Sequence, residues 1–171
     1  MTDYDPLTLA GIVGKWAVER PDFQVLTVEG AGVRADETRT YAQLWDKGRG
    51  LAAGLHRLGL EPGDRVGTLL ANHVEFVDLM VASSLLGIAL VPIDPRTRGD
   101  KLIYMLAAAG CKGVVAGDYA LPEILAVRER VAGLQWVVGV PTDEGRATTP
   151  QLQAVGVRPY GELAGTDFRG E

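Results

Sequence analysis

The sequence predicts an α/β fold, in which a mainly parallel sheet is flanked by helices and preceded by a small N-terminal hairpin. Three short apolar runs, at residues 66–71, 113–116 and 135–140, are bounded by turn residues, which is typical of strands covered on both faces. Helical patterns separate these runs. Strands that alternate with helices imply a parallel sheet joined by right-handed crossovers.

The composition is that of a globular protein with a sizeable core. The chain has 171 residues, of which 47% are hydrophobic, and its net charge is −5. Disorder would require a lower hydrophobic content, and a nucleic-acid partner would require a basic stripe that the sequence lacks. A chain of this length suits one domain or two small ones.

Cysteine usage indicates a reducing compartment. Cys111 is the only cysteine, so a disulfide within the chain is impossible. It lies in an apolar run, where a small buried side chain is favoured over a reactive thiol. Residues 1–5 lack the apolar core of a signal peptide, so we expect a cytoplasmic protein.

The N-terminal residues are expected to form a helix followed by a hairpin. Apolar residues at helical spacing predict a helix over residues 7–20, which Pro21 ends. Alternating residues predict a strand over 23–29, a turn at 30–37 and a returning strand at 38–40.

The next helix has clear start and stop signals. Thr40 and Gln43 form a capping box, in which each side chain accepts a hydrogen bond from the other residue's backbone. Gly59 supplies a left-handed stop, and Pro62 prevents continuation. One continuous buried stripe is expected along this helix: Tyr41, Leu44, Trp45, Gly48, Leu51, Ala52, Leu55 and Leu58.

The stretch from Asn72 to Asp94 is the most informative part of the sequence. Asn72 is expected to cap a helix, with Glu75 as its return partner. The residues that follow are apolar on nearly every face, which predicts a buried helix that Pro92 ends. A membrane span is the alternative, but Asp78 argues against it because a charge is costly in lipid.

Two more helices are expected after this stretch. An extended link at residues 93–96 leads to Thr97, which with Asp100 is a plausible cap for a helix that Gly110 ends. A second helix starts near Pro122, because proline is favoured in the first turn, and Gly133 ends it.

The pattern changes near residue 140. We therefore assign residues 1–140 to the α/β part of the protein. Residues 141–171 are rich in glycine and proline, which predicts a linker-like tail in which only residues 155–163 are expected to be locally ordered.

No group of residues predicts a catalytic centre or a metal site. His56 and His73 are the only histidines; we expect His56 to be solvated and His73 to cap a helix or be exposed. Zinc is excluded by two separated histidines and one cysteine. Gly48, Gly50 and Gly54 lie in mid-helix, so close packing is favoured over a dinucleotide-binding loop.

The residues from Asp94 onward give one weaker candidate. Asp94 precedes Pro95, and a role in a turn is expected for it. Arg96, Arg98 and Lys101 form a small basic cluster, for which a solvated helix start is favoured over an anion site.

Four segments in order resemble the adenylate-forming (AMP-binding) superfamily, whose members activate carboxylic acids with ATP. They are Thr40-Tyr41-Ala42-Gln43-Leu44, Gly63-Asp64-Arg65-Val66, Asn72-His73-Val74-Glu75-Phe76 and Leu86-Gly87-Ile88-Ala89-Leu90-Val91-Pro92-Ile93-Asp94. Pro92-Ile93-Asp94-Pro95-Arg96 is more similar to acyl-CoA ligases than to the amino-acid-activating modules of peptide synthetases. The resemblance implies an N-terminal portion of an acyl-CoA synthetase, with a Rossmann-like layer in an incomplete N-terminal domain.

The resemblance implies the chemistry of a longer enzyme. An intact ligase would convert a carboxylate, ATP and coenzyme A into acyl-CoA, AMP and pyrophosphate with Mg²⁺, as in fatty acid metabolism. In the family, the phosphate-binding loop follows a segment similar to residues 160–163, and a catalytic lysine lies in a C-terminal domain. The 171 residues contain neither, so we expect no catalytic residue, metal ligand or cofactor for this chain alone. Its expected partner is the remainder of the enzyme.

Two questions stay open at this stage. The residues that bind a cofactor are not identified: the turn at 117–120 can lie near the coenzyme A nucleotide in the family, but here it has no basic residue. The first alternative to a ligase portion is a non-enzymatic binding or self-association module, for instance a homodimer; a further one is an independent α/β nucleotide-binding domain, which ATP would stabilise. Apolar surface and a free sheet edge on a domain cut from a larger fold would favour the first alternative.

Overall fold

The chain folds into two compact units. The computed structural model describes residues 5–30, 35–142, 145 and 147–163. Unit 1 comprises Met1–Glu61, Asn72–Gly87 and Leu163–Glu171, and unit 2 comprises Pro62–Ala71 and Ile88–Glu162. The sequence led us to expect one α/β part over residues 1–140, whereas the chain passes between the two units several times within that range.

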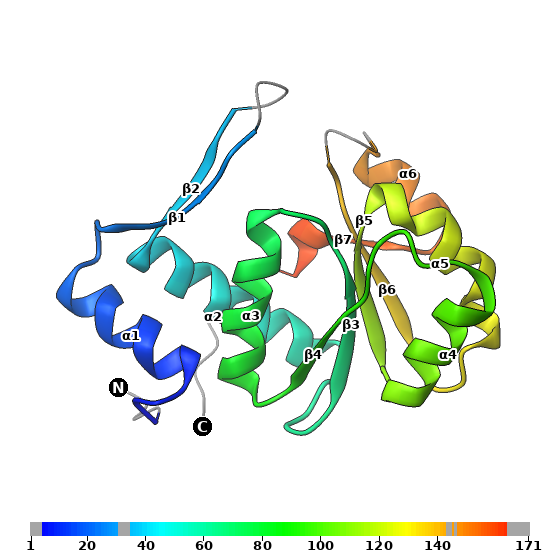
Figure 1. Cartoon of the computed structure of the whole chain (residues 1–171), viewed down its shortest axis with the longest axis horizontal. Helices are drawn as coiled ribbons and strands as arrows, with labels where there is room; N and C mark the ends of the chain where they lie inside the picture. The colour runs from blue at the N-terminus through cyan, green and yellow to red at the C-terminus, as the bar shows by residue number, and fades with distance from the viewer. Residues whose placement is uncertain (1–4, 31–34, 143–144, 146, 164–171) are drawn as a thin grey trace. The chain divides into compact units, whose positions relative to one another are not determined.

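Unit 1, in its described residues, consists of helices and an antiparallel hairpin (Figure 1). Its elements are α1 (Leu9–Glu19), β1 (Gln24–Val28), β2 (Glu37–Thr40), α2 (Tyr41–Arg57) and α3 (Val74–Leu86). Helix α2 packs against α1 and α3. The predicted first helix, hairpin strands and second helix are therefore confirmed. The predicted turn extends into residues 31–34, which lie outside the described part of the chain.

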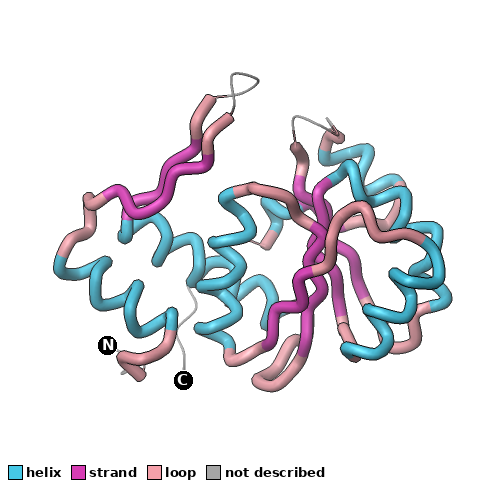
Figure 2. Tube along the Cα trace, viewed as in Figure 1, coloured by secondary structure: helices cyan, strands magenta, loops and turns pink. Residues whose placement is uncertain are grey.

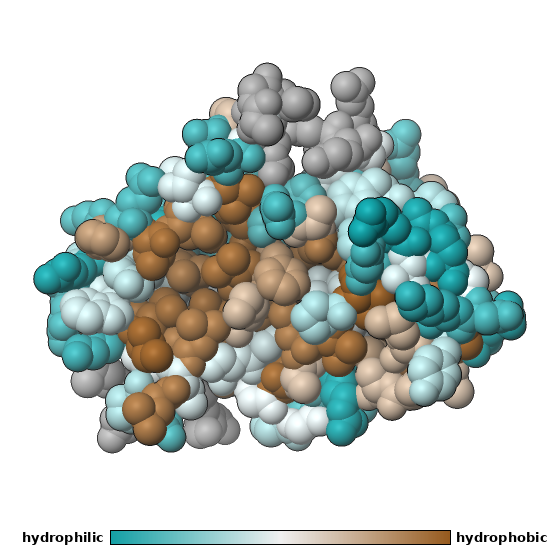
Figure 3. Space-filling model, viewed as in Figure 1, coloured by the Kyte–Doolittle hydropathy of each residue, from teal (hydrophilic) through white to brown (hydrophobic). Residues whose placement is uncertain are grey.

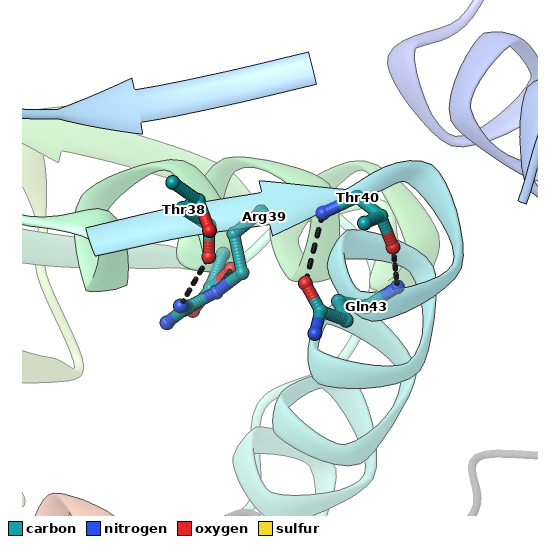
Figure 4. A network of polar contacts seen from close by, with 5 residues as sticks. Thr38, Arg39, Thr40 and Gln43 are labelled. Atoms are coloured by element: carbon teal, nitrogen blue, oxygen red, sulfur yellow. Dashed lines mark hydrogen bonds and ion pairs between the residues drawn. The ribbon is translucent and has the colours of Figure 1, made fainter. Parts of the chain in front are cut away.

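The start of α2 confirms the predicted capping box (Figure 4). The Thr40 hydroxyl accepts a hydrogen bond from the Gln43 amide at 3.3 Å, and the Gln43 side chain accepts one from the Thr40 amide at 2.9 Å. Two amides that the helix itself leaves without partners are thus satisfied. Beyond its end, Gly59 takes the left-handed conformation, with φ of 87°.

Both ends of α3 differ from the prediction. The capping position is His73, not Asn72, and the His73 side chain makes no capping hydrogen bond. The helix ends at Gly87, which has φ of 70°, and not at Pro92. Glycine turns the chain here because it has no Cβ to clash in the left-handed region. Pro92 instead lies at the end of a strand.

Unit 2 is built on a five-stranded sheet in the order β4-β3-β5-β6-β7, in which all neighbouring strands are parallel (Figures 1 and 2). Its strands are β3 (Arg65–Leu69), β4 (Ala89–Pro92), β5 (Gly113–Gly117), β6 (Trp136–Val140) and β7 (Arg158–Pro159). Its helices are α4 (Gly99–Ala109), η1 (Asp118–Ala120), α5 (Leu121–Val127), η2 (Arg128–Arg130), α6 (Thr149–Ala154) and η3 (Tyr160–Glu162). The predicted parallel sheet is confirmed.

Helices α4, α5 and α6 cover one face of this sheet (Figure 1). The hydrophobic core between them combines strand and helix side chains, including Leu69, Val114, Val137, Leu102, Leu106, Ile124 and Leu152. In β5, every residue is buried, which explains why this strand reads as a continuous apolar run in the sequence.

The helix boundaries in unit 2 correct two predictions. The capping position of α4 is Arg98, not Thr97, and it has no side-chain capping bond, whereas the predicted end at Gly110 is confirmed by its φ of 65°. Helix α5 ends at Val127 and is continued by η2, so Gly133 is not its stop.

The linker-like tail predicted after residue 140 contains more regular structure than expected: α6 lies before the segment predicted to be locally ordered, and β7 and η3 lie within that segment. Leu152 and Val157 are buried in the core of unit 2. The prolines in this stretch misled the prediction because they occupy tolerated places. Pro150 lies in the first turn of α6, and Pro159 lies in β7 at the edge of the sheet.

Candidate functional site

The candidate site is a depression of about 660 Å³ at the carboxyl ends of three strands in unit 2. Its lining residues follow β3, β4 and β5: Ala71, Asp94, Pro95, Arg96, Arg98 and Tyr119. The strand order places β3 between β4 and β5, so the chain passes from β3 to β4 on one side and then crosses to β5 on the other side of β3. Open α/β sheets bind ligands at such a switch point, outside the carboxyl ends of the strands.

Asp94 and Arg96 form a closed turn on one side of the depression. The Asp94 carboxylate accepts hydrogen bonds from the Arg96 amide at 2.8 Å, from Nε at 3.1 Å and from Nη2 at 2.8 Å. These bonds, first those from the Arg96 side chain, lower the pKa of Asp94 to about 2. The predicted role of Asp94 in a turn is confirmed.

Arg98 is the second cation in the lining. Its Nη1 donates to the Pro95 carbonyl at 2.7 Å and to the Thr97 carbonyl at 3.1 Å. Its Nε lies 3.1 Å from a carboxylate oxygen of Glu123, at the start of α5. Both guanidinium groups are therefore held in place by neighbouring oxygens, and a planar guanidinium is suited to bind phosphate or carboxylate.

Tyr119 forms the wall beside β5. Its hydroxyl accepts a hydrogen bond from the Ala71 amide at 2.8 Å, which joins the ends of β3 and β5. Its ring lies over Gly117, where a Cβ would come within 2.5 Å of the ring. Glycine is thus needed at 117 for the ring to lie across the strand end.

Asp118 fixes the backbone next to Tyr119. The carboxylate is buried and accepts hydrogen bonds from the Thr142 hydroxyl at 2.5 Å and from the Ala147 amide at 2.7 Å. It therefore ties the turn after β5 to the residues that follow β6.

The structure unites residues that sequence reasoning treated separately. The basic cluster was considered without the turn at 117–120, yet Arg96, Arg98 and Tyr119 line one depression, of which Lys101 is not a part. Ala71 was missed, and Tyr119 was considered only as part of the turn at 117–120. The signal was available, because residues directly after parallel strands meet at the same edge of a sheet.

The remaining candidate residues have structural surroundings. Cys111 is buried, as predicted, and burial raises the pKa of its thiol. The His56 side chain is half exposed, as predicted. His73 is only 4% exposed and occupies the capping position of α3, one of the two predicted alternatives, without a side-chain capping bond. Gly48 packs against α3, where a Cβ would lie 2.5 Å from a methyl of Val81, which confirms close packing.

Two features are absent from the described residues. No cluster of three or more His, Cys, Asp or Glu side chains that could hold a metal ion occurs among them. No helix in the same part of the chain is long and apolar enough to span a membrane.

Comparison with known families gives a match over most of the chain. The sequence model of the family described as AMP-binding enzyme matches residues 13–161. A long-chain-fatty-acid–CoA ligase of Mycobacterium tuberculosis is 37% identical over 93 residues, which are 54% of this chain and 18% of that protein. A 3-methylmercaptopropionyl-CoA ligase of Ruegeria lacuscaerulensis is 27% identical over 168 residues, 95% of this chain and 30% of that protein. Malpibaldin synthetase of Mortierella alpina is 33% identical over 103 residues, 60% of this chain and 2% of that protein.

Solved structures give the same result for the fold. A fatty acyl CoA synthetase of Mycobacterium tuberculosis superposes with a TM-score of 0.75 and 25% identity, covering 96% of this chain and 29% of that one. The inhibitor-bound N-terminal domain of FACL13 from the same organism gives a TM-score of 0.76 and 26% identity, covering 96% and 37%. The chain spans less than a third of the length of each of the three curated relatives named above.

Proposed function

This chain belongs to the AMP-binding enzyme family as an N-terminal portion of an adenylate-forming acyl-CoA ligase, and on that premise we propose that it supplies scaffold and not the catalytic centre. The proposal is supported by the family match over residues 13–161 together with the coverage of the relatives: the chain spans only 18% and 30% of the length of the two CoA ligases named above. The alignment of a carboxylate with ATP demands donors around the reacting phosphate. We propose that the remainder of the ligase supplies these donors, so that the chain alone makes no adenylate.

The intact ligase would join a carboxylic acid to coenzyme A at the expense of ATP. Relatives are named for long-chain fatty acids and for 3-methylmercaptopropionate, so the acid varies among them. A carboxylic acid of fatty acid metabolism is our proposed substrate class, and the cytoplasm our proposed location. Coenzyme A supplies the thiol that accepts the acyl group; ATP and Mg²⁺ are assigned to the remainder of the enzyme.

We assign the depression in unit 2 to the nucleotide part of coenzyme A. Two guanidinium groups, of Arg96 and Arg98, provide charge for phosphate, and the ring of Tyr119 provides a flat apolar wall. The two arginines compensate for the lack of a basic residue at 117–120: they follow β4, which is separated from β5 by β3. Arg96 would have to share its donors between Asp94 and the ligand.

A fusion protein tests the scaffold role. Residues 13–161 replace the matching segment of the Mycobacterium tuberculosis long-chain-fatty-acid–CoA ligase, and acyl-CoA formation is measured. We expect the folded fusion to retain ligase activity, since the scaffold would present the partner's catalytic residues in their usual places. A fusion that folds cooperatively and has no activity would contradict the proposal.

Substitutions in the same fusion test the depression. Arg96→Ala and Arg98→Ala should raise the KM for coenzyme A by about tenfold each while kcat stays within about twofold. Lys101→Ala is the matched control, because this exposed lysine belongs to the same basic cluster and lies outside the lining. An unchanged KM in both arginine variants would remove the assignment and leave the scaffold role intact.

Self-association is a second candidate function for the chain on its own. Large apolar side chains are exposed on unit 1: Leu7, Ile12, Val18, Phe23, Val25 and Met80. Figure 3 shows apolar surface gathered over the helices of this unit. Apolar patches of this kind mark contact with another protein surface. A homodimer would cover it in the isolated chain, and the remainder of the ligase would cover it in an intact enzyme.

A further inference from the structure

Leu163 is held against helix α2 by two residues of that helix. Arg57 donates a hydrogen bond from Nη2 to the Leu163 carbonyl at 3.2 Å. Gly54 lies against the same residue, because a Cβ at 54 would come 2.8 Å from the Leu163 Cα and still closer to its carbonyl oxygen. The Leu163 side chain is only 3% exposed. Backbone and side chain are therefore both fixed, and all three residues belong to unit 1.

Gly54 lowers the intrinsic stability of helix α2. A glycine inside a helix destabilises it by about 1 kcal/mol relative to alanine. Gly54 lies within α2, three residues before Arg57, so the two share one face of the helix. The close approach of Leu163 explains the glycine, because any side chain would occupy the space of the Leu163 carbonyl. Gly54 thus leaves space for the Leu163 carbonyl group, and Arg57 donates a hydrogen bond to it.

Leu163 is also the residue at which the chain returns to unit 1. Ile88–Glu162 belong to unit 2, and Leu163 begins the last segment of unit 1. We infer that Gly54 and Arg57 are positioning residues, which fix the point from which the polypeptide beyond Leu163 extends in the ligase. The functional part of this inference rests on the proposed function, whereas the anchoring of Leu163 can be tested on the chain itself.

Hydrogen exchange on the full 171-residue chain tests the anchoring. Gly54→Ala should speed exchange of the amides of residues 160–163 by at least about tenfold, although alanine is the better helix former. Arg57→Ala should act in the same direction, and Arg57→Lys should restore part of the protection because lysine also donates. The rate at which the buried Cys111 is alkylated reports global opening, and in the variants it should stay within about twofold of the rate in the parent. Unchanged exchange in both Gly54→Ala and Arg57→Ala would overturn the inference.

The positioning role is tested by the kinetics of a fusion protein in which the segment taken from this chain extends through residue 163. Gly54→Ala should lower kcat by about tenfold while the KM for coenzyme A stays within about twofold, because a displaced segment misplaces reacting groups without touching the depression. Asp46→Ala, an exposed position on the same helix, is the control and should leave kcat unchanged. An active parent fusion whose kcat is insensitive to Gly54→Ala would overturn the inference. An inactive parent would count against the proposed function, and hydrogen exchange would still decide on the anchoring.

Discussion

Arg39 in strand β2 binds the buried carboxylate of Asp78 in helix α3 with two nitrogens of its guanidinium. Nη2 lies 3.0 Å from Oδ2, and Nε lies 3.3 Å from each carboxylate oxygen. Figure 4 shows Arg39 also donating to the Thr38 carbonyl, at 3.1 Å. Asp78 is 1% exposed, and burial raises its pKa against the opposing effect of Arg39. The pair fastens the hairpin of unit 1 to a helix that is largely apolar.

Removal of Arg39 should destabilise the protein more than removal of the Asp78 charge, which Arg39 neutralises. Arg39→Ala leaves a buried carboxylate without its cation and should lower the free energy of unfolding by about 3–5 kcal/mol. Asp78→Asn should cost about 1–2 kcal/mol, because an amide is cheaper to bury than a carboxylate. Denaturant unfolding measures both.

A double variant is the control for this pair. Arg39→Met with Asp78→Leu replaces both charges by apolar groups and should stay within about 1 kcal/mol of the parent. A loss in Arg39→Ala no larger than that in Asp78→Asn would show that the pair does not hold the hairpin.

The capping box of α2 should account for a measurable share of stability. Thr40→Ala removes the acceptor for the Gln43 amide and should lower the free energy of unfolding by about 1 kcal/mol. Thr40→Ser keeps the hydroxyl and should behave like the parent. Equal stabilities of the alanine and serine variants in thermal unfolding would exclude a role for the cap.

The turn at Asp94 makes a prediction about pH. The Arg96 hydrogen bonds lower the pKa of Asp94 from 3.8 to about 2. A carboxyl group with a lowered folded pKa contributes stability above its unfolded pKa and loses it as the pH falls through the folded pKa. The contribution should therefore be complete above pH 3.8 and disappear as the pH falls through about 2.

A titration by NMR of the Asp94 carboxyl carbon measures this shift. The midpoint should lie at about 2 in the parent and move up towards 3.8 in Arg96→Gln, which lacks the charge and keeps the backbone amide. A midpoint near 3.8 in the parent would show that the turn is not held by Arg96 in solution.

The isolated chain should self-associate through unit 1. Val18→Lys together with Phe23→Lys places charges at positions that are 74% and 53% exposed and should weaken association by at least about tenfold. Tyr104→Lys is the matched control, because Tyr104 is 73% exposed and lies in unit 2. Sedimentation velocity distinguishes the outcomes, and a parent chain that stays monomeric at about 100 μM would refute the expectation.

Local signals made part of the fold predictable. The capping box at Thr40 and the stops at Gly59 and Gly110 depend on neighbouring residues only, and the structure confirms them. The stretch after Leu86 was assigned wrongly because an apolar run does not distinguish a buried helix from a buried strand. Gly87 was the available signal for the boundary.

Contacts between residues distant in sequence could not be predicted in the same way. Arg39 and Asp78 are brought together only when the hairpin packs on α3, although an aspartate in an apolar helix does call for a cation. Likewise, Asp94, Arg96 and Arg98 were identified as candidates, but their proximity to Tyr119 depends on the order of the strands.

The most direct test of the scaffold account is pyrophosphate release from ATP and Mg²⁺ across a panel of carboxylic acids, measured for the 171-residue chain and for the fusion side by side. We predict acid-dependent release by the fusion and none by the chain alone, since the chain would lack the groups that align the acid with ATP. Acid-dependent release catalysed by the purified chain by itself would contradict the account.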